Sequence, residues 1–483
     1  MSRVCGEAVL LGHTIGLRLA LASIAALGLS ACADDWKRAP LGVNSPSRWE
    51  DVRSPKAVWP QSDWWRGFGS VELTSLVTEA ERANQDIGAA KARIEQADAQ
   101  VRINGASLVP LIDGSGEGSV QRSAGGQRVA GIQAVLNASY ELDFWGKNRA
   151  TVRAAQASAT AARFDEETVA LSTVTSVANT YFALMSAQER LAIARSNVKS
   201  AQTVLDAIQG RVDVGTASGL DRAQQRSILD QQRATIPPIE QEIRTNQTAL
   251  ALLLGRPPVA LNVKGGRLTA LKTPRVAPGM PADLLLRRPD VRQAEAALAS
   301  TDADVTAARA AFLPSITLTG QGGFESTALK TLFSGSSALY SVASGLTQPI
   351  LDPTLPGNLD LSKGQYRENL YAYRKAAIQS FVDVENALIT MRKSAEQERL
   401  QEAAVKSARE AYDISQAQMK EGTVDLVTVL DTQQTLFSAQ QNLAEARLSR
   451  YQAIVSMFSA LGGGWAASGK TAGGAPLPEA SIR

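Results

Sequence analysis

Histidine and cysteine are nearly absent from this sequence. Its 483 residues include one histidine, His13, and two cysteines, Cys5 and Cys32. So few imidazole and thiol groups argue against a disulfide framework, zinc sites, histidine-dependent catalytic triads and most redox centres. An excess of either charge is missing too. The 50 basic and 47 acidic residues give a net charge of +3, which provides no electrostatic reason to expect a nucleic acid partner.

Motifs for catalysis are scarce as well. The single Gly-x-x-x-x-Gly-Lys-Ser/Thr match, at 464–471, lies in the expected tail and not between a predicted strand and a helix, so we do not expect a phosphate-binding loop, and the energy for any transport would come from a partner. No clustered pair of acidic residues supports the remaining option, an anchored hydrolase that works with carboxylates alone. We therefore expect a protein that is not an enzyme and that holds no metal and no soluble cofactor.

Residues 1–31 have the pattern of a secretory signal peptide. Arg3 and Arg18 precede an apolar run at positions 19–29, and small residues follow it. The run is too short to span a membrane as a helix. Cleavage after this segment would remove His13, so the mature chain would contain no histidine.

The end of this leader predicts a lipid anchor. Residues 29–32, Leu-Ser-Ala-Cys, resemble the lipobox of bacterial lipoproteins, in which the cysteine is acylated and becomes the new N-terminus. Cys32 would then carry a covalent lipid, such as palmitate, and Ala33 in place of aspartate favours sorting to the outer membrane. The alternative is an ordinary leader in which Cys32 falls by chance.

The body of the chain contains the same unit twice. Asp86-Ile87 matches Asp290-Val291 at a shift of 204 residues, and neighbouring positions match in the same register. Further on, the string Val-Lys-Ser-Ala at 198–201 recurs at 405–408, a shift of 207. A register held over so many residues indicates an internal duplication.

Each copy is expected to run helix, strand, loop, strand, long helix, turn, long helix. The expected organisation is a signal peptide at 1–31, an acylated N-terminal segment and lead-in helix at 32–85, repeat 1 at 86–255, a connector at 256–285, repeat 2 at 286–462 and a disordered tail at 463–483.

The segment 130–144 alternates between two kinds of side chain. Its even positions are apolar and its odd positions mostly polar over 15 residues, far longer than a usual strand of about 5–6 residues. A membrane β-barrel strand has this length and pattern, because one face meets lipid and the other a wet lumen. Copy two repeats the pattern more weakly at 316–324 and 340–346. On the pattern alone, a long soluble hairpin is the alternative.

Two uninterrupted stretches predict unusually long helices. Residues 147–209 contain no proline or glycine, and 358–421 contain no proline and only Gly364. At ~1.5 Å per residue the first would span roughly 95 Å. Both are followed by Gly-Thr and another helical segment, so each copy predicts a long helical hairpin. Pro237-Pro238 is expected to split the last helix of copy one.

The last helix of copy two has the spacing of a coiled coil. Mostly apolar residues step by three and four along it, and a second row lies beside the first. Two rows indicate two neighbouring helices, as expected for one helix in the wall of a helical barrel. The alternative is a simple dimeric coiled coil, which would need only one row. The first row is Val427, Leu430, Gln434, Phe437, Gln441, Ala444, Leu448, Tyr451, Val455 and Phe458, and the second is Leu436, Leu443, Ile454 and Leu461.

These elements require several chains to assemble. One chain is expected to supply four long strands, whereas the smallest natural membrane barrel has about eight. An open sheet edge in lipid leaves backbone amides unpaired, at several kcal/mol each. Two chains would leave a lumen filled by side chains, whereas three would enclose an aqueous passage, so we prefer a trimer. The expected fold class is mixed α and transmembrane β, with a trimeric twelve-stranded barrel continued by a long α-helical barrel.

Three segments resemble the TolC-like outer-membrane efflux proteins, specifically their lipoprotein branch of the NodT and OprM type. The lipobox at Cys32 is one, and residues 64–69, Trp-Trp-Arg-Gly-Phe-Gly, resemble the family's N-terminal Trp-Trp segment. The most specific is Leu-Gly-Arg-Pro-Pro at 254–258 followed by Met-Pro-Ala-Asp-Leu-Leu-Leu-Arg-Arg-Pro-Asp-Val-Arg at 280–292, which resembles the family's mid-chain signature. The resemblance covers about 63–462.

This resemblance implies a homotrimer in the bacterial outer membrane, in contact with its lipid and with a helical periplasmic extension. Its partners would be a periplasmic adaptor (membrane-fusion) protein and an inner-membrane pump of the RND type. Its function would be passive conduction of drugs or other toxic solutes outward, a basis of multidrug resistance. Two alternatives stay open: the outer-membrane duct of a type I protein secretion system, and a periplasmic coiled-coil lipoprotein that tethers envelope layers without a pore.

The expected partner-contacting residues lie at the turns of the two helical hairpins. These turns resemble the family's tip motif that meets the adaptor, and glycine there also supplies the positive φ of a helix C-terminus. The tip residues are Val214, Gly215 and Thr216 in copy one and Glu421, Gly422 and Thr423 in copy two.

A gate is expected just beyond the second tip. The stretch 424–431 resembles the one whose side chains line the family's closed end, and Val427 and Asp431, four residues apart, share a helix face. In a trimer Asp431 would form a ring of carboxylates beneath an apolar constriction, a cation-attracting gate. A solvated carboxylate that aids the helix dipole is the alternative. Copy one has Leu220 and Gln224 at the matching positions, so one copy alone would supply the charge.

Overall fold

The computed structural model describes Trp36 and residues 38–50, 58–122, 125, 126, 128–261 and 263–464. The expected signal peptide, the lipobox with Cys32 and most of the expected disordered tail lie outside this part. The chain forms two compact units. The first combines the described residues up to Gly42 with those of Ile94–Ala162 and Ala294–Arg374, and the second combines the described residues of Val43–Arg93, Arg163–Gln293 and Lys375–Gly464.

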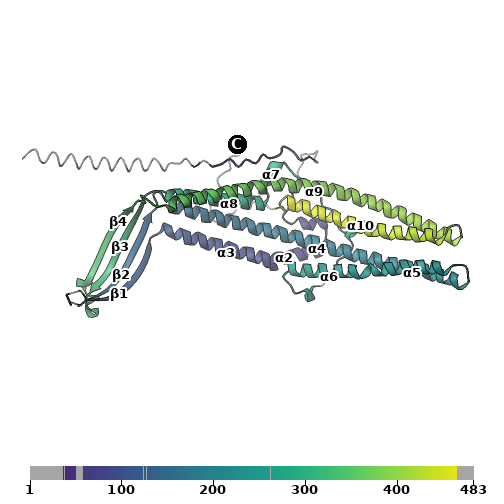
Figure 1. The fold of residues 1–483 in the computed structure, drawn as a ribbon, viewed down its shortest axis with the longest axis horizontal. Helices are drawn as coiled ribbons and strands as arrows, with labels where there is room; N and C mark the ends of the chain where they lie inside the picture. The colour runs from purple at the N-terminus through teal and green to yellow at the C-terminus, as the bar shows by residue number, and fades with distance from the viewer. Residues whose placement is uncertain are drawn as a thin grey trace, which may run out of the picture. The chain divides into compact units, whose positions relative to one another are not determined.

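Four antiparallel strands form a sheet in the first unit, in the order β1-β2-β3-β4 (Figure 1). The strands are β1 (Leu111–Arg122), β2 (Arg128–Leu142), β3 (Ser315–Ser326) and β4 (Ala338–Thr347). Each copy of the duplication supplies one hairpin, and the hairpins join through β2 and β3. Within the described residues, β1 and β4 each have one strand neighbour, so they are the two edges of the sheet.

The register gives this sheet two chemically different faces. Ala134 pairs with Gly116 on β1 and with Phe324 on β3, and Phe324 pairs with Ala338 on β4, so even-numbered positions share one face. The even face carries Ile112, Val120, Ile132, Leu136, Tyr140, Leu142, Ile316, Leu318, Phe324, Tyr340, Val342 and Leu346, and the odd face carries Asp113, Ser115, Glu117, Gln133, Asn137, Glu141, Thr317, Gln321 and Glu325. The alternation predicted for 130–144 is therefore confirmed as far as Leu142, where β2 ends two residues earlier than expected, and it extends over all four strands.

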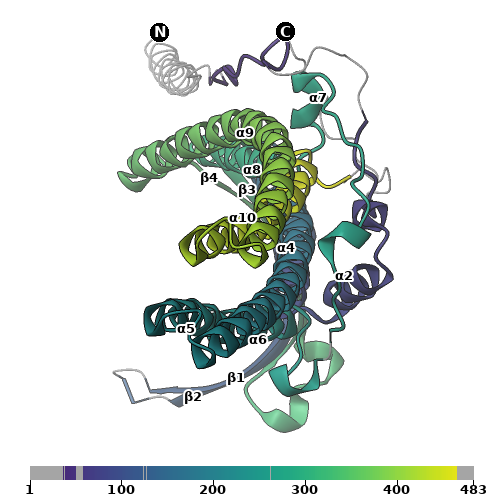
Figure 2. The same cartoon turned by 90° about the vertical axis from the view of Figure 1, so that its right-hand side faces the viewer.

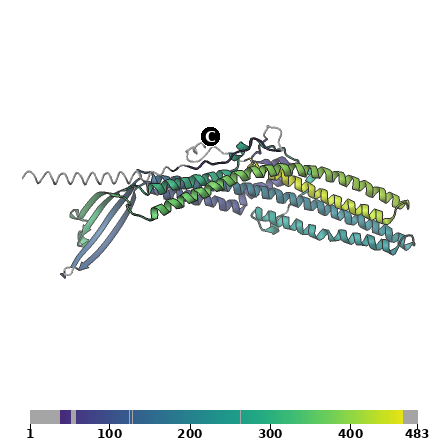
Figure 3. The ribbon, with the colours of Figure 1, turned by 45° about the horizontal axis from the view of Figure 1, so that its top comes forward.

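Two helices are far longer than the others. α4 (Lys147–Asp213) and α9 (Thr354–Lys420) each have 67 residues (Figure 3), or about 100 Å at ~1.5 Å per residue. Both predicted long helices are confirmed. α9 begins earlier than the expected start at residue 358, because Pro356 lies in its first turn, where a missing backbone N–H costs no hydrogen bond.

Two shorter helices precede the hairpins of the sheet. α3 (Gln85–Gly105) leads to β1 and α8 (Pro289–Ala310) leads to β3. Pro110 follows α3 and Pro289 opens α8, as the sequence predicts. None of the helices in the described ranges is long and apolar enough to cross a membrane.

Each copy ends in a helical hairpin. In copy one, α4 is followed by α5 (Gly219–Ala234) and α6 (Ile236–Leu253), which Figure 2 shows as separate segments. In copy two, α9 is followed by the unbroken α10 (Leu426–Ala460). Pro237-Pro238 stands in the first turn of α6 and explains the break, because proline has no backbone N–H with which to continue α5.

The two rows on α10 face different neighbours at Leu436 and Phe437, as predicted, whereas Ile454 of the second row shares one core cluster with Tyr451 of the first. Phe437 of the first row packs with Ala201 of α4 and Leu229 of α5. Leu436 of the second row packs in a cluster with Tyr412 of α9. The first row departs from the prediction at its start, where Val427 and Gln434 are exposed.

An aromatic core joins the N-terminal segment of the second unit to its helices. Trp64 stacks on Phe458 with ring centroids 4.8 Å apart, and Phe68 meets Phe182 edge-on at 4.9 Å. The Trp-Trp string of the sequence is therefore a packing element that lies against α4 and α10. The remaining short elements include the α-helices α2 (Val71–Ala83) and α7 (Pro281–Leu285) and the 3₁₀-helices η1 (Trp64–Phe68) and η5 (Leu329–Thr331).

The two copies close with equivalent hydrogen bonds. In copy one the buried Asn84 donates its side-chain N–H to the carbonyl of Leu253 at 2.9 Å. In copy two Arg288 donates Nη1–H to the carbonyl of Ala460 at 3.3 Å. The first pair of residues is related by the shift of 204 and the second by the shift of 207. The duplication therefore holds at the level of single contacts.

Arg288 in the mid-chain signature occupies an architectural position. Its guanidinium pairs with Asp290 at 2.6 Å and with Asp383 of α9 at 2.9 Å. Burial lowers the pKa of Arg288, but the bonds to Asp290 and Asp383 outweigh it and raise the pKa above its ordinary value. A permanently charged group thus joins α8, α9 and the end of α10.

Candidate functional site

The two predicted tips have the same backbone geometry. Gly215 and Gly422 follow α4 and α9 with φ values of 78° and 77°, a region that other L residues rarely adopt. The backbone N–H of Thr216 and of Thr423 returns to the carbonyl five residues earlier, at 2.8 and 3.0 Å. Both hydroxyls bond to the same carbonyls. These are Schellman-type helix ends, so the turn itself accounts for each glycine, and the threonine hydroxyls add a second bond to the same carbonyls.

The tip side chains project away from the helices they join. Val214 is 74% exposed, and Glu421 is exposed at the equivalent position. Ser218 caps α5, and Asp425 caps α10 by accepting the backbone N–H of Thr428 at 3.0 Å. The bonds from Thr428 hold the pKa of Asp425 below its ordinary value. Each tip is therefore a well-defined turn whose outer residues are uncovered in the single chain.

The predicted gate residues share an exposed face of α10. Val427 is 47% exposed, and Asp431 is exposed one turn further along. The Asp431 carboxylate makes no hydrogen bond or ion pair within the part of the chain that the structure describes, whereas Val429 on the other side of the helix is buried. At the matching positions of copy one, Leu220 is exposed and Gln224 half-buried, so the carboxylate belongs to copy two alone.

A polar network behind the tips was not predicted. The buried hydroxyl of Tyr412 on α9 accepts hydrogen bonds from Gln416 at 2.6 Å and from Gln433 on α10 at 3.0 Å. It also lies 3.3 Å from the hydroxyl of Ser200 on α4. The network therefore connects three helices close to the predicted gate. The one feature of the sequence that could have indicated this network is Gln433, a polar residue between the two mostly apolar rows of α10.

A cluster of charges further along the same helices was also missed. Arg447 on α10 forms ion pairs with Glu189 on α4 at 3.3 Å and with Glu398 and Glu402 on α9 at 3.4 and 3.2 Å. Arg450 adds a 2.6 Å bond to Glu398. The side chains of Arg447, Glu189 and Glu398 are only 18%, 10% and 11% exposed. Because water solvates these charges so poorly, each needs an opposite charge beside it to offset the lost solvation. The ion pairs therefore fix the spacing of the three helices.

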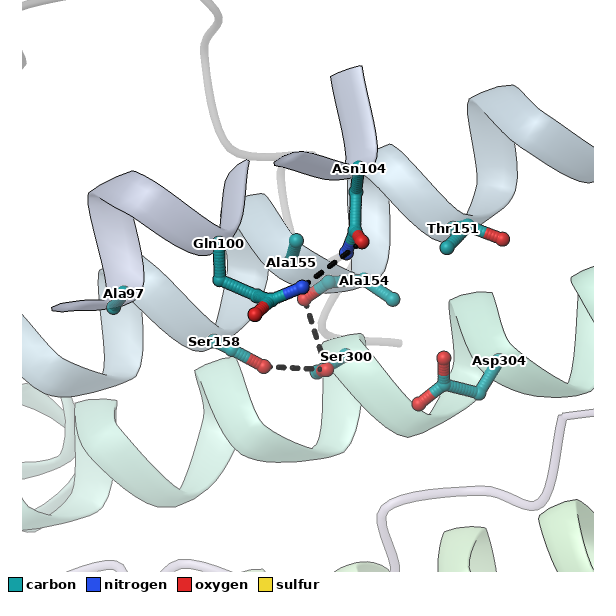
Figure 4. Close-up of a pocket in the computed structure, with 9 residues that line it drawn as sticks. All are labelled: Ala97, Gln100, Asn104, Thr151, Ala154, Ala155, Ser158, Ser300 and Asp304. Atoms are coloured by element: carbon teal, nitrogen blue, oxygen red, sulfur yellow. Dashed lines mark hydrogen bonds between the residues drawn. The ribbon is translucent and has the colours of Figure 1, made fainter. Parts of the chain in front are cut away.

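A hollow of about 280 Å³ lies between α3, α4 and α8 of the first unit (Figure 4). Ser300 donates to the carbonyl of Ala154 at 2.9 Å, and its hydroxyl lies 2.9 Å from that of Ser158. Burial raises the pKa of Asp304. The lining residues are Ala97, Gln100, Asn104, Thr151, Ala154, Ala155, Ser158, Ser300 and Asp304. In the described ranges, no group of three or more His, Cys, Asp or Glu side chains is placed to hold a metal ion.

Comparison with known proteins identifies close parallels along the whole body of the chain. A family model described as outer membrane efflux protein matches residues 76–256 and 280–463. The pyoverdine export outer membrane protein OpmQ of Pseudomonas putida is 36% identical over 445 residues, which cover 89% of this chain and 94% of that protein. The toluene efflux pump outer membrane protein TtgF, from another strain of Pseudomonas putida, is 34% identical, with 88% of each chain covered.

Solved structures show the same architecture. The outer-membrane channel OprN superposes with a TM-score of 0.83 at 25% identity, over 89% of this chain and 99% of that one. The open state of the Neisseria gonorrhoeae MtrE outer membrane channel gives a TM-score of 0.82 at 27% identity, over 89% of this chain and 97% of that one.

Proposed function

The chain belongs to the outer membrane efflux protein family, and from that premise we propose that three identical copies close their sheets into one barrel. The protein is an outer-membrane duct of an efflux system, and the family consists of channel and efflux proteins rather than enzymes. In the proposed trimer each copy contributes four strands to a twelve-stranded barrel and its long helices to a periplasmic extension. The cargo would be drugs or other toxic solutes, conducted passively.

The observation that carries this proposal is the two-faced sheet with two open edges. An edge strand in lipid leaves its backbone groups unpaired, at a cost of several kcal/mol per group. Pairing β1 of one copy with β4 of the next removes both edges. The even face would then meet lipid, which accounts for a Val342 side chain that is 78% exposed in the single chain. The odd face, with Asp113 and Glu117, would line a wet lumen.

A charge placed on each face in turn tests this arrangement. Leu136→Arg puts a guanidinium in the middle of the proposed lipid face and is expected to destabilise the barrel by about 2–4 kcal/mol. The matched control Asn137→Arg puts the same group on the proposed lumen face and should be tolerated. The measurement is the yield of heat-stable trimer from outer membranes, together with conductance in planar bilayers. A parent chain that stays monomeric and conducts nothing contradicts the duct and favours the tether.

The tips and the leader supply the proposed attachments. We place the periplasmic adaptor at the exposed residues Val214, Gly215, Thr216, Glu421, Gly422 and Thr423, because a well-defined turn with uncovered side chains suits a docking contact. The adaptor would link the duct to an inner-membrane RND-type pump, which provides the energy. Cys32, outside the described residues, would carry the covalent lipid.

Asp431 is proposed as a gate residue. Asp431→Ala is expected to raise the resting conductance and lower the cation selectivity of the trimer, because three carboxylates leave the constriction and a smaller side chain widens it. Single-channel recording at fixed salt measures both quantities. The control is Asp413→Ala, which removes an exposed carboxylate from α9 instead. Unchanged conductance and selectivity in Asp431→Ala would remove this residue from the gate.

A further inference from the structure

Two arginines stand at the far end of the apolar face of the sheet. Arg122 is the last residue of β1 and Arg128 the first of β2, and they are direct cross-strand partners. Both have even numbers, so they share the face that carries Val120 and Leu136. This hairpin end is the end of the sheet opposite the helices of the first unit (Figure 1).

The sheet does not compensate these two charges. Like charges directly opposite each other destabilise an antiparallel pair. Within the described residues neither guanidinium has an ion-pair partner, and the sheet carboxylates of Glu117 and Glu325 lie on the odd face. A third cation, the exposed Lys330 in η5, lies in the other hairpin turn at the same end. The uncompensated arginine pair is suited to an anionic ligand.

The height of the pair matches the level of lipid headgroups. The ten residue-to-residue steps from Ile112 to Arg122 cover ~34 Å along the strand at ~3.4 Å each, and a tilt of ~40° reduces this to ~26 Å across the membrane. The apolar band of outer-membrane barrels is about 25 Å tall. Phe144 and Trp145, 65% and 47% exposed, stand at the helix end of the sheet, where an aromatic girdle is expected. The arginines therefore fall at the opposite boundary.

We propose that Arg122 and Arg128 bind the phosphate groups of a phosphorylated glycolipid in the outer leaflet of the outer membrane. The guanidinium fork matches phosphate oxygens in a bidentate manner, and a phosphate between the two side chains replaces their mutual repulsion by charge-assisted hydrogen bonds. The inference rests on the proposed barrel, which puts the even face in lipid and this hairpin end at the outer surface.

The test uses the full-length trimer in detergent and lipid A as the probe. Binding of phosphorylated lipid A, of chemically dephosphorylated lipid A and of inorganic phosphate is measured by native mass spectrometry. We expect R122Q/R128Q to bind phosphorylated lipid A about tenfold or more weakly than the parent, equivalent to the loss of about 1.4 kcal/mol or more. R122K/R128K, which keeps the charges, should retain most of the binding. The control R153Q removes an exposed arginine of α4 and should bind like the parent.

The comparison of phosphorylated with dephosphorylated lipid A uses the parent protein alone. It therefore decides the outcome even where a variant fails to assemble. Equal affinity of the parent for phosphorylated and dephosphorylated lipid A overturns the inference, and so does parent-like binding by R122Q/R128Q. Competition by inorganic phosphate at lipid-like concentrations would identify a simple anion site instead of a lipid site and would also overturn it. A conducting trimer that ignores the lipid A phosphates refutes this inference only, whereas a parent that forms no conducting trimer refutes the proposed barrel.

Discussion

Gly462→Ala is expected to prevent stable assembly of the chain. Gly462 has a φ of 83°, a conformation that costs other L residues roughly 1–2 kcal/mol. A Cβ at this position would also lie well inside 3.0 Å of the carbonyl oxygen of Arg287, a backbone atom that cannot rotate away. Overpacking of this kind adds about 1–3 kcal/mol, so the total loss is about 2–5 kcal/mol. That is a large share of the ~5–15 kcal/mol that stabilises a folded protein.

The internal duplication provides a second copy of this experiment. Gly255 has a φ of 64°, and its Cβ would collide with the carbonyl oxygen of Ala83, so Gly255→Ala should lose a similar amount of stability. The control is Gly88→Ala in α3, where the added Cβ meets nothing within 4 Å and should stabilise the helix by up to ~1 kcal/mol. Urea titration of the trimer, followed by gel and circular dichroism, compares the three. A Gly462→Ala trimer as stable as Gly88→Ala would contradict the assigned contact.

Patterns along the chain predicted the elements and faces of this fold. The alternation at 130–144 depends only on the two-residue period of a strand, so it fixed which side chains share a face before any partner strand was known. The two prolines at 237–238 likewise predicted the break between α5 and α6, because the missing N–H is a local property. The matching shifts of 204 and 207 predicted that both copies would fold alike.

The contacts that join the helices could not be predicted in the same way. Asn84 and Arg288 hold equivalent carbonyls with different side chains, so no shared residue type marks their role. The hydroxyl of Tyr412 finds its partners on two other helices, and a tyrosine in an apolar row is normally a packing residue. Glu398 lies in a charge-rich helix and would be expected in water, whereas the fold buries it against α10. In each case the role depends on which helices meet.

Arg447→Met is expected to destabilise the protein by about 3 kcal/mol. Methionine keeps the length of the apolar stem but removes the guanidinium, and Glu189 and Glu402 then lose a cation partner at this site. Breaking a buried ion pair on one side costs about 3–5 kcal/mol. Arg450 stays paired with Glu398 and compensates part of the charge, which places the expected loss at the lower end of that range. Thermal dissociation of the trimer measures the effect.

A matched surface substitution separates burial from charge in this cluster. Arg195 and Glu240 form an ion pair at 2.9 Å, but their side chains are 62% and 48% exposed, so Arg195→Met should cost less than about 1 kcal/mol. Adding Glu189→Gln to Arg447→Met removes one of the stranded carboxylates, and it should restore part of the stability if the loss arises from unpaired charge. A double variant that is as unstable as the sum of the two single variants would assign the loss to packing instead. Partial recovery of stability would mean that the pairing of these carboxylates with the arginines of α10 holds α4, α9 and α10 in register. A displacement of α10 would then expose Glu189 and Glu398 together.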